Sequence, residues 1–196
     1  MRIQLVYVSL LMLVSVIAQA QALTYSILVG NDPVGQLTAT ESAYIGGSTV
    51  VNIDSKLTIS FIGSFVIESH QMAYFRRRVL QEAEQIITRN GKLKEQTVVK
   101  RTASGYQVQR KGENDLTISG EVLFTMGQLY HHEPKGISQV FSERFGLLCA
   151  VRVVGAGQYE VTLPNGSVNR YTYGRGVCQR METTSNLKDV RFERRP

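Results

Sequence analysis

Residues 49–102 read TVVNIDSKLTISFIGSFVIESHQMAYFRRRVLQEAEQIITRNGKLKEQTVVKRT, and this stretch determines the expected fold. Apolar and polar residues alternate in its first part, so Leu57 and Ile59 face one way while their polar neighbours face the other. An alternation with a period of two is typical of a β-strand with one buried face. Asn90-Gly91 tolerates the positive φ angles of a type I′ turn and therefore predicts a hairpin between two such strands.

The same pattern continues towards both ends of the chain. Segments rich in Val, Ile, Thr, Tyr and Phe alternate with turns that contain Gly or Asn, and Asn165-Gly166 predicts a second tight hairpin. On this basis we expect about eleven or twelve strands. One segment departs from the pattern, because the apolar side chains of residues 121–132 fall at helical spacing. This spacing predicts one short helix that ends before Pro134.

Many strands joined by tight turns predict a mainly β fold. No linker or low-complexity stretch divides the chain, so we expect a single β domain over residues 21–196. A twisted sheet with more than about ten strands tends to curl or split. We therefore expect one curled antiparallel sheet that forms a half-barrel, a barrel or a β-roll, with the short helix plugging or covering its concave face.

The start of the chain has the pattern of a secretory signal peptide. The positive Met1-Arg2 precedes an apolar run and small residues suited to cleavage after Ala20 or Ala22. Residues 1–20 are the predicted signal peptide, and we expect the exported product in the periplasm or outside the cell. The run is shorter than the roughly 20 residues of a bilayer span, so we expect no transmembrane segment in the mature chain.

The chain is modestly basic, with a formal net charge of +6. Most basic residues are dispersed, apart from Arg76-Arg77-Arg78 and the C-terminal tail. A basic exported protein can meet anionic polymers or lipid head groups, whereas export makes nucleic acid an unexpected partner. The arginine triplet could bind phosphate or carboxylate groups. The interpretation that we favour from sequence is a solvated turn whose charge discourages aggregation between sheet edges.

The two cysteines, Cys149 and Cys178, fall in predicted strands of the C-terminal part. In an oxidising compartment they could form a disulfide. Pairing requires the two Cα atoms to approach within about 7 Å, which sequence does not reveal. We expect two buried free thiols, with the disulfide as the alternative.

Several short motifs are distributed over most of the predicted mature chain: NGKLKE at 90–95, LYHHEP at 129–134, VFSERFG at 140–146, LPNG at 163–166, YTY at 171–173 and GVC at 176–178. Together they resemble a family of small exported bacterial proteins that is classed as a domain of unknown function. The resemblance implies an exported, mainly antiparallel β protein and supplies no activity. The expected shape is also similar to periplasmic half-barrels that carry lipoproteins or lipids, an analogy at the level of fold alone.

His131-His132-Glu133 contains residue types that bind metals. Adjacent side chains point apart on a helix or a strand, so the three cannot readily hold one ion. Zinc sites usually use histidines at other spacings and need a further ligand. We therefore expect no metal site, and we interpret the cluster as the polar end of the predicted helix.

Ser142-Glu143-Arg144 could suggest a hydrolase. Such an enzyme needs a base beside the serine and an oxyanion hole, and the chain has no Gly-x-Ser-x-Gly motif. The alternative is a strand in which Phe141, Glu143 and Phe145 share the inner face. A buried carboxylate needs a partner, and we expect Glu133 or Glu143 to pair with Arg144 or another arginine.

The function that we favour from sequence is non-enzymatic binding of a lipid or another apolar or amphipathic ligand on the concave face. No catalytic residue and no cofactor is expected. A structural or interaction module that contacts a protein of the cell envelope is the alternative, and a hydrolase is the least favoured class. The candidate ligand-binding residues are Tyr130, Glu133, Phe141, Glu143, Arg144 and Phe145.

Overall fold

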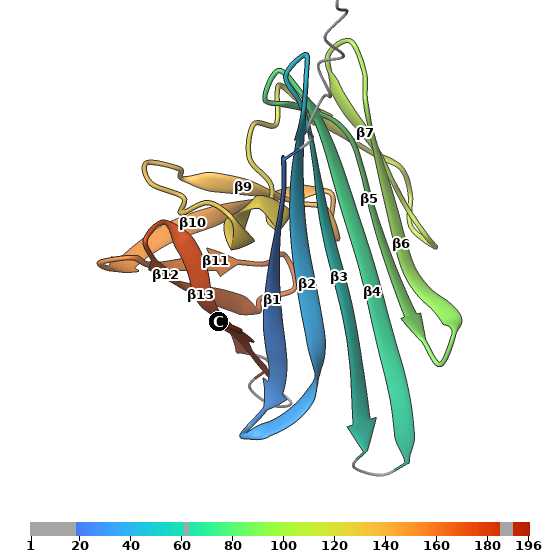
Figure 1. Cartoon of the computed structure of the whole chain (residues 1–196). Helices are drawn as coiled ribbons and strands as arrows, with labels where there is room; N and C mark the ends of the chain where they lie inside the picture. The colour runs from blue at the N-terminus through green and yellow to red at the C-terminus, as the bar shows by residue number, and fades with distance from the viewer. Residues whose placement is uncertain (1–18, 61–62, 185–189) are drawn as a thin grey trace, which may run out of the picture.

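The structure is a computed structural model that describes residues 19–60, 63–184 and 190–196. Most of the predicted signal peptide lies outside this range, so its cleavage and the export of the product stay predictions. The strands are β1 (Gln19–Val29), β2 (Asp32–Tyr44), β3 (Ser48–Ser60), β4 (Ser64–Arg76), β5 (Val79–Arg89), β6 (Lys92–Arg101), β7 (Gly105–Arg110), β8 (Leu116–Ser119), β9 (Gln139–Ser142), β10 (Leu147–Gly155), β11 (Gln158–Thr162), β12 (Val168–Gly174), β13 (Val177–Thr184) and β14 (Val190–Arg194). A short 3-10 helix, η1 (Gly127–Tyr130), lies between β8 and β9 (Figure 1).

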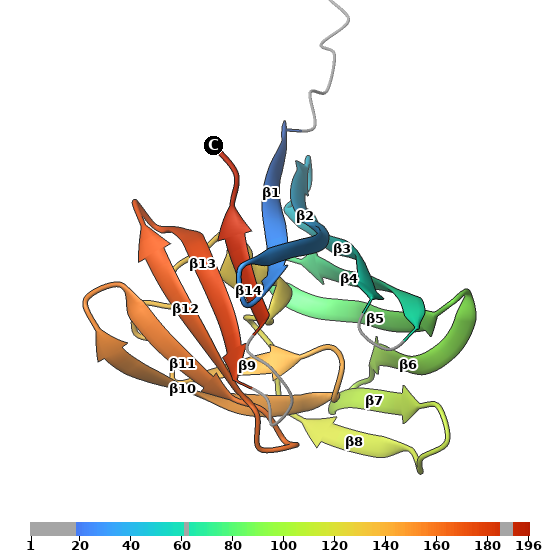
Figure 2. The same cartoon turned by 90° about the horizontal axis from the view of Figure 1, so that it is seen from below.

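All the strands belong to one antiparallel sheet of fourteen strands. Consecutive strands are neighbours throughout, except at β8 and β9, which form the two ends of the sheet. The first and last strands also pair, from Tyr25 opposite Arg194 to Val29 opposite Val190. The sheet is therefore an up-and-down ring that is open at a single seam, and Figure 2 shows it curled around the segment that contains η1. The prediction of one curled antiparallel sheet is confirmed, and the ring is not closed by strand pairing.

Side-chain burial alternates along the strands as a half-buried sheet requires. In β7, for example, Tyr106 and Val108 are buried and Gln107 between them is exposed. The predicted hairpin between β5 and β6 is confirmed, because Asn90 and Gly91 both have positive φ, at 50° and 72°. These angles match the twist of the flanking strands, which is why Asn-Gly favours this turn.

The seam between β8 and β9 is held by side chains and by the crossing segment rather than by a ladder. The hydroxyl of Thr97 on β6 donates to the Arg144 carbonyl at 2.7 Å. The Arg144 guanidinium binds both carboxylate oxygens of Glu95, each at 2.7 Å. Gly146 lies so close to β7 that a Cβ on it would come within 2.2 Å of Val108. The turn after β9 is therefore fastened to β6 and β7.

The predicted helix over residues 121–132 is wrong except for η1. The backbone of this segment bonds to other strands instead of to itself. The Leu80 N–H donates to the Val122 carbonyl, and Phe141 and Phe124 are joined by a backbone hydrogen bond. Only residues 127–130 form helical turns, and they lie inside the sheet against β2, β3, β4 and β13. Sequence also missed β8, and the described residues form fourteen strands where about eleven or twelve were expected.

The interior on one side of η1 is filled by aromatic side chains. Tyr25 and Tyr130 pack edge to face with ring centroids 5.1 Å apart, and the Tyr25 hydroxyl donates to the Cys178 carbonyl at 2.9 Å. Edge-to-face aromatic pairs add to the stabilisation that burial provides. Within the described residues, no helix is long and apolar enough to cross a membrane.

Candidate functional site

A cleft of about 240 Å³ lies inside the curled sheet, on the concave face. Its walls come from β2–β5 on one side and from β12–β14 on the other, and η1 and the turn after β9 border it. The apolar part of its lining consists of Leu37, Ile53, Met126, Tyr130, Phe145, Leu163, Tyr171, Met181 and Phe192. The polar part consists of Ser55, Ser69, Gln71, Gln85, Ser142, Glu143, Arg144, Asn169 and Thr183. An apolar cavity with a few converging polar groups is the usual form of a small-molecule site.

Glu143 is the most deeply buried charged side chain of this cleft, with 1% of its surface exposed. The Gly127 N–H donates to Glu143 Oε1 at 3.1 Å, while Oε2 has no hydrogen-bond partner. Burial raises the pKa of the Glu143 carboxyl, and the neighbouring Thr125 and Gln71 oppose this shift only in part. A protonated carboxyl can also donate a hydrogen bond, so Glu143 offers both a donor and an acceptor.

Gly127 allows η1 to approach β3 and β4 closely. A Cβ at this position would lie 2.8 Å from Gln71 Nε2 and 3.1 Å from Glu143 Oε1. Both distances are shorter than ordinary contacts, so a larger residue would separate the amide from the carboxyl. The absence of a side chain here is what brings Gln71, Glu143 and the backbone of η1 together at one end of the cleft.

The wall of long strands contributes a band of polar side chains. Gln85 is almost fully buried and donates to the Ser69 hydroxyl at 2.8 Å and to the His70 carbonyl at 3.2 Å. On the facing wall, Asn169 Oδ1 is buried without a hydrogen-bond partner. A buried acceptor of this kind is costly unless a ligand or water satisfies it. The cleft thus presents amide, hydroxyl and carboxyl groups to its interior.

Four of the six predicted ligand-binding residues line the cleft: Tyr130, Glu143, Arg144 and Phe145. Phe141 is buried in the core instead, where its ring lies 6.4 Å from that of Tyr106. Glu133 lies elsewhere and accepts a hydrogen bond from the Tyr159 hydroxyl at 2.9 Å.

The predicted ion pairs of this region are wrong. Arg144 binds Glu95 on β6, so it pairs with neither Glu133 nor Glu143. Glu133 pairs with Lys135 at 3.2 Å. The predicted shared strand face of residues 141, 143 and 145 is also wrong, because β9 ends at Ser142 and a turn follows. In place of the ion pair that we expected, burial raises the pKa of the Glu143 carboxyl, which favours its neutral form.

Sequence reasoning missed Ser69, Gln71 and Gln85. A signal for Gln71 and Gln85 was present, because Gln71 is in phase with the buried Ala73 and Phe75, and Gln85 with the buried Ala83. Polar residues at inward positions of a strand point to a polar interior or a ligand.

Cys149 and Cys178 are buried free thiols, and the alternative of a disulfide between them is not realised in the structure. They lie on β10 and β13, with β11 and β12 between these strands in the sheet. Burial raises the pKa of Cys149 to about 11 and that of Cys178 to about 12. Thiols that stay protonated at neutral pH are poor nucleophiles and poor metal ligands.

The histidine pair is divided between two environments. His132 Nε2 lies 2.6 Å from Glu41 Oε2, and the hydrogen bond raises the pKa of His132. His131 is buried, which lowers its pKa, and neither of its ring nitrogens has a partner. Across residues 19–60, 63–184 and 190–196, no three His, Cys, Asp or Glu side chains gather as a metal site would require. Ser142 Oγ accepts a bond from the Phe145 N–H at 3.4 Å, and His132 is held by Glu41, so the two do not form a nucleophile and base.

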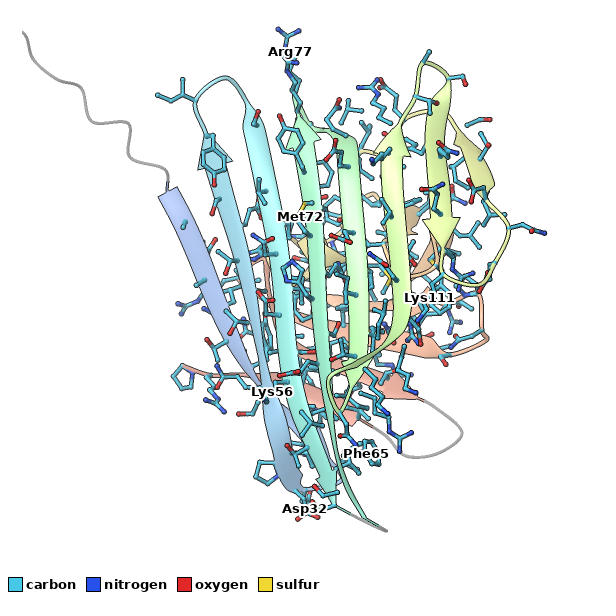
Figure 3. All side chains as sticks on the ribbon, turned by 90° about the vertical axis from the view of Figure 1, so that its right-hand side faces the viewer. Asp32, Lys56, Phe65, Met72, Arg77 and Lys111 are labelled. Atoms are coloured by element: carbon cyan, nitrogen blue, oxygen red, sulfur yellow. The ribbon has the colours of Figure 1, made fainter. Side chains whose placement is uncertain are left out.

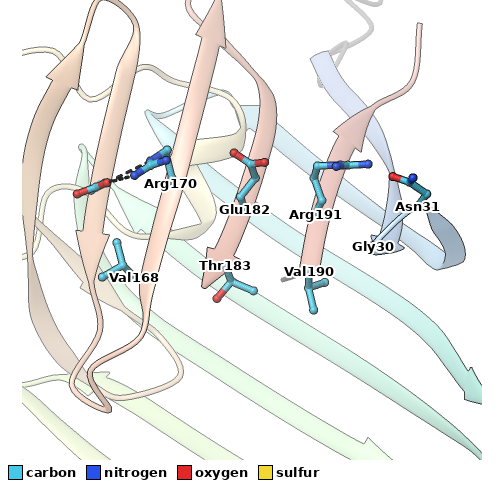
Figure 4. Close-up of a pocket in the computed structure, with 9 residues that line it drawn as sticks. Gly30, Asn31, Val168, Arg170, Glu182, Thr183, Val190 and Arg191 are labelled. Atoms are coloured by element: carbon cyan, nitrogen blue, oxygen red, sulfur yellow. Dashed lines mark hydrogen bonds and ion pairs between the residues drawn. The ribbon is translucent and has the colours of Figure 1, made fainter. Parts of the chain in front are cut away.

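A second hollow, of about 300 Å³, lies outside the cleft on the C-terminal strands (Figure 4). Its charged side chains belong to a row that runs in register across β10–β14: Arg152, Glu160, Arg170, Glu182 and Arg191. We call this row the charge ladder. Glu160 bonds to both Arg152 and Arg170. Arg191 pairs with Glu193, and Glu182 lies 3.8 Å from Arg180, so these charges have partners within the protein and the cleft is the better candidate site.

Residues 25–195 match the model of a protein family described as a domain of unknown function, DUF6134, and the chain belongs to that family. Among solved structures, it is similar to a crystal structure of a beta-barrel-like protein of domain of unknown function DUF1849 from Brucella abortus. The TM-score is 0.59 at 11% sequence identity, and the match covers 92% of this chain and 98% of that one. At this identity the likeness concerns the fold alone. A search of curated proteins found no match.

Proposed function

We propose that the protein binds a small amphipathic ligand in the cleft, without catalysis. The observation that carries the proposal is the lining, which combines nine apolar and nine polar side chains from both walls, the η1 segment and the turn after β9. The apolar part of the ligand would pack against residues such as Leu37, Met181 and Phe192. Its polar end would meet Gln71, Glu143 and Asn169.

The polar groups favour a neutral head group over an anionic one. Burial raises the pKa of the Glu143 carboxyl and so favours its uncharged form, and an anionic group on the ligand would find no opposite charge there. The one basic side chain of the lining, Arg144, donates from Nε and Nη2 to the two carboxylate oxygens of Glu95. Hydroxyl or amide groups on the ligand could pair with Glu143 Oε2 and Asn169 Oδ1, which lack partners.

The size of the cleft limits the ligand. About 240 Å³ is less than the roughly 300–1,000 Å³ of typical sites for drug-sized molecules. A short acyl chain with a hydroxylated head group fits this volume, whereas a whole phospholipid does not. We also propose that binding takes place in the periplasm or outside the cell, as the predicted signal peptide implies.

The proposal is tested by native mass spectrometry of delipidated protein. Monooctanoylglycerol, octanoate and a bacterial lipid extract are each added, and the protein is repurified and weighed. Retention of monooctanoylglycerol, and weaker retention of octanoate at neutral pH, is the expected result. Ser55→Phe, which fills the cleft, should abolish retention. Ser42→Phe, which places the same ring at an outward-facing position of β2, should not.

Absence of any retained mass from all three sources would overturn the proposal. Equal retention by Ser42→Phe and Ser55→Phe would place binding outside the cleft. The alternative function is a structural module of the cell envelope. It is supported by the aromatic side chains that fill the interior on the other side of η1 and leave less room for a ligand. It predicts no retained mass and capture of a specific envelope protein.

A further inference from the structure

Two neighbouring turns form one end of the sheet, which is the upper end in Figures 1 and 3. The turn after β2 contains Tyr44 to Gly47, and the turn after β4 contains Arg76 to Arg78. The Arg77 N–H donates to the Gly47 carbonyl at 2.8 Å, so the two turns are fastened together. Leu123, from the segment that crosses the seam, borders a hollow with Arg78. We call these two turns and Leu123 the arginine rim.

The arginine rim exposes large apolar side chains at its tips. Ile45 is 77% exposed, Leu123 is 59% exposed and Tyr44 is 48% exposed. Single exposed apolar residues are common, but three on neighbouring loops at one end mark an interaction surface. The side chains project from turns instead of lining a groove, which suits insertion between flexible molecules more than docking onto a folded partner.

The positive charge of the arginine rim is not neutralised within the molecule. Among the described residues, no carboxylate forms an ion pair with Arg76, Arg77 or Arg78, whereas the nearby Arg101 is paired with Glu121 at 2.7 Å. Arg76, Arg77 and Arg101 border a shared hollow of about 380 Å³. Unpaired guanidinium groups around a hollow can bind phosphate oxygens.

The backbone angles of the turn after β4 indicate that arginine is not there because it favours the geometry of this turn. Arg77 and Arg78 have φ angles of 50° and 68°, nearly the same as the 50° and 72° of Asn90 and Gly91. Asn-Gly is the preferred pair for this geometry, whereas two arginines are strained in it. The strained turn holds Arg77 and Arg78, whose charges have no partner among the described residues. Backbone strain of this kind clusters at functional sites, so it points to a function here.

We propose that the arginine rim docks the protein onto a membrane surface that contains anionic lipids. The arginines would bind lipid phosphates, while Ile45, Leu123 and the ring of Tyr44 enter the boundary between head groups and acyl chains. Tyrosine and arginine both suit this boundary, because each has an apolar body and a polar tip. The inference is independent of what the cleft binds.

The experiment measures co-sedimentation of the full mature chain with vesicles. The protein should bind vesicles that contain phosphatidylglycerol beside phosphatidylcholine, and it should bind vesicles of phosphatidylcholine alone only weakly. Salt at 1 M should abolish most of the binding to the anionic vesicles. The double variant Arg77→Asn/Arg78→Gly converts the turn to the favoured pair. It should raise the melting temperature and weaken binding about 30-fold, since each basic residue near such a surface contributes about 1 kcal/mol.

Matched controls separate the arginine rim from total charge and total apolar surface. Lys92→Gln/Lys94→Gln also removes two positive charges, at the start of β6, which lies at the far end of β5 from the arginine rim, and should leave most binding intact. Ile45→Ser should weaken binding, whereas Val153→Ser, which changes a side chain that is 66% exposed on the C-terminal strands, should not.

Equal binding to both vesicle types would overturn the proposal. So would unchanged binding by the Asn-Gly variant or equal losses in the two double variants. Binding of soluble polyphosphate or heparin without vesicle binding would assign the arginine rim to a polyanion instead. If the Asn-Gly variant failed to fold, Arg77→Gln/Arg78→Gln would take its place in the same comparison.

Discussion

Glu143 in the cleft and Glu160 in the charge ladder are both buried side chains, but the pKa values of their carboxyl groups are shifted in opposite directions. Glu160 lies in register between Arg152 and Arg170, whose hydrogen bonds lower its pKa. Glu143 meets the Gly127 N–H, Gln71 and Thr125, and burial raises its pKa. On the outer surface the arginines favour the ionised form of Glu160, whereas in the interior burial favours the neutral form of Glu143.

This difference bears on what each region can do. In the charge ladder Glu160 bonds to arginines on both neighbouring strands, so it joins β10, β11 and β12 side by side. In the cleft, Glu143 Oε2 and Asn169 Oδ1 have no hydrogen-bond partner. Polar groups that already bond to one another, as in the charge ladder, stabilise the fold. Polar groups without a hydrogen-bond partner, as in the cleft, are available to bind a neutral ligand.

The largest expected effect concerns the turn that carries Glu143. Gly146→Ala places a Cβ 2.2 Å from Val108 at a φ of 64°, so we expect a loss of about 3 kcal/mol in the free energy of unfolding. Gly166→Ala, in a turn between two strands of the ladder, meets no atom within 4 Å and should lose only about 1 kcal/mol. Urea denaturation measures both. Equal losses would show that the seam is not tightly packed at Gly146.

The next effect tests the neutral carboxyl directly. Glu143→Gln keeps the shape and the acceptor for Gly127 but cannot ionise, so at neutral pH we expect it to stabilise the protein by about 1–3 kcal/mol. The folded-state pKa of Glu143 lies above its unfolded value. The contribution of its protonated form is therefore complete below the unfolded pKa and is lost as pH rises through the folded pKa.

Denaturation of both proteins from about pH 4 to pH 8 checks this sign. The advantage of Glu143→Gln should grow as pH rises and should vanish at the acidic end. An advantage that grew towards acid would mean that Glu143 is ionised in the folded protein and held by a partner.

A smaller effect is expected from the ion pair that fastens the same turn to β6. Arg144→Gln removes two hydrogen bonds to Glu95, but both side chains are more than a third exposed, so solvent screens the pair. We expect a loss of about 0.5–1 kcal/mol. The loss should shrink when denaturation is repeated at high salt. A loss independent of salt would assign the effect to packing of the arginine stem.

The smallest effect is expected in the charge ladder. Glu160→Gln leaves Arg152 and Arg170 near each other, but both are well exposed and can turn towards solvent. A slight fall in melting temperature at neutral pH is the expected result, opposite in sign to that of Glu143→Gln. Thermal denaturation of the two variants side by side shows whether the signs differ, and equal signs would contradict the contrast between the two acids.

Local patterns predicted most of the sheet, and non-local contacts account for the errors. Period-two alternation and Asn90-Gly91 found β3–β6, because burial on one face and turn geometry act over a few residues. The helical spacing in residues 121–132 was misleading, because Val122 and Phe124 bond to strands distant in sequence. Glu143 does line the cleft, but its expected pairing with an arginine is wrong, since nothing local shows that Arg144 faces Glu95.

The pairing of β1 with β14 has a consequence for how the chain is made. Tyr25 lies opposite Arg194, so this contact joins almost the first described residues to almost the last. Contacts between such distant residues form slowly, because closing the long intervening loop costs entropy before the contact can stabilise the chain. Until β14 has been synthesised and has docked, β1 and β13 are open edges, and open edges recruit strands from other chains. We therefore expect the growing chain to be most prone to aggregation just before its last strand arrives, and a holdase that covers these two edges would matter most at that moment.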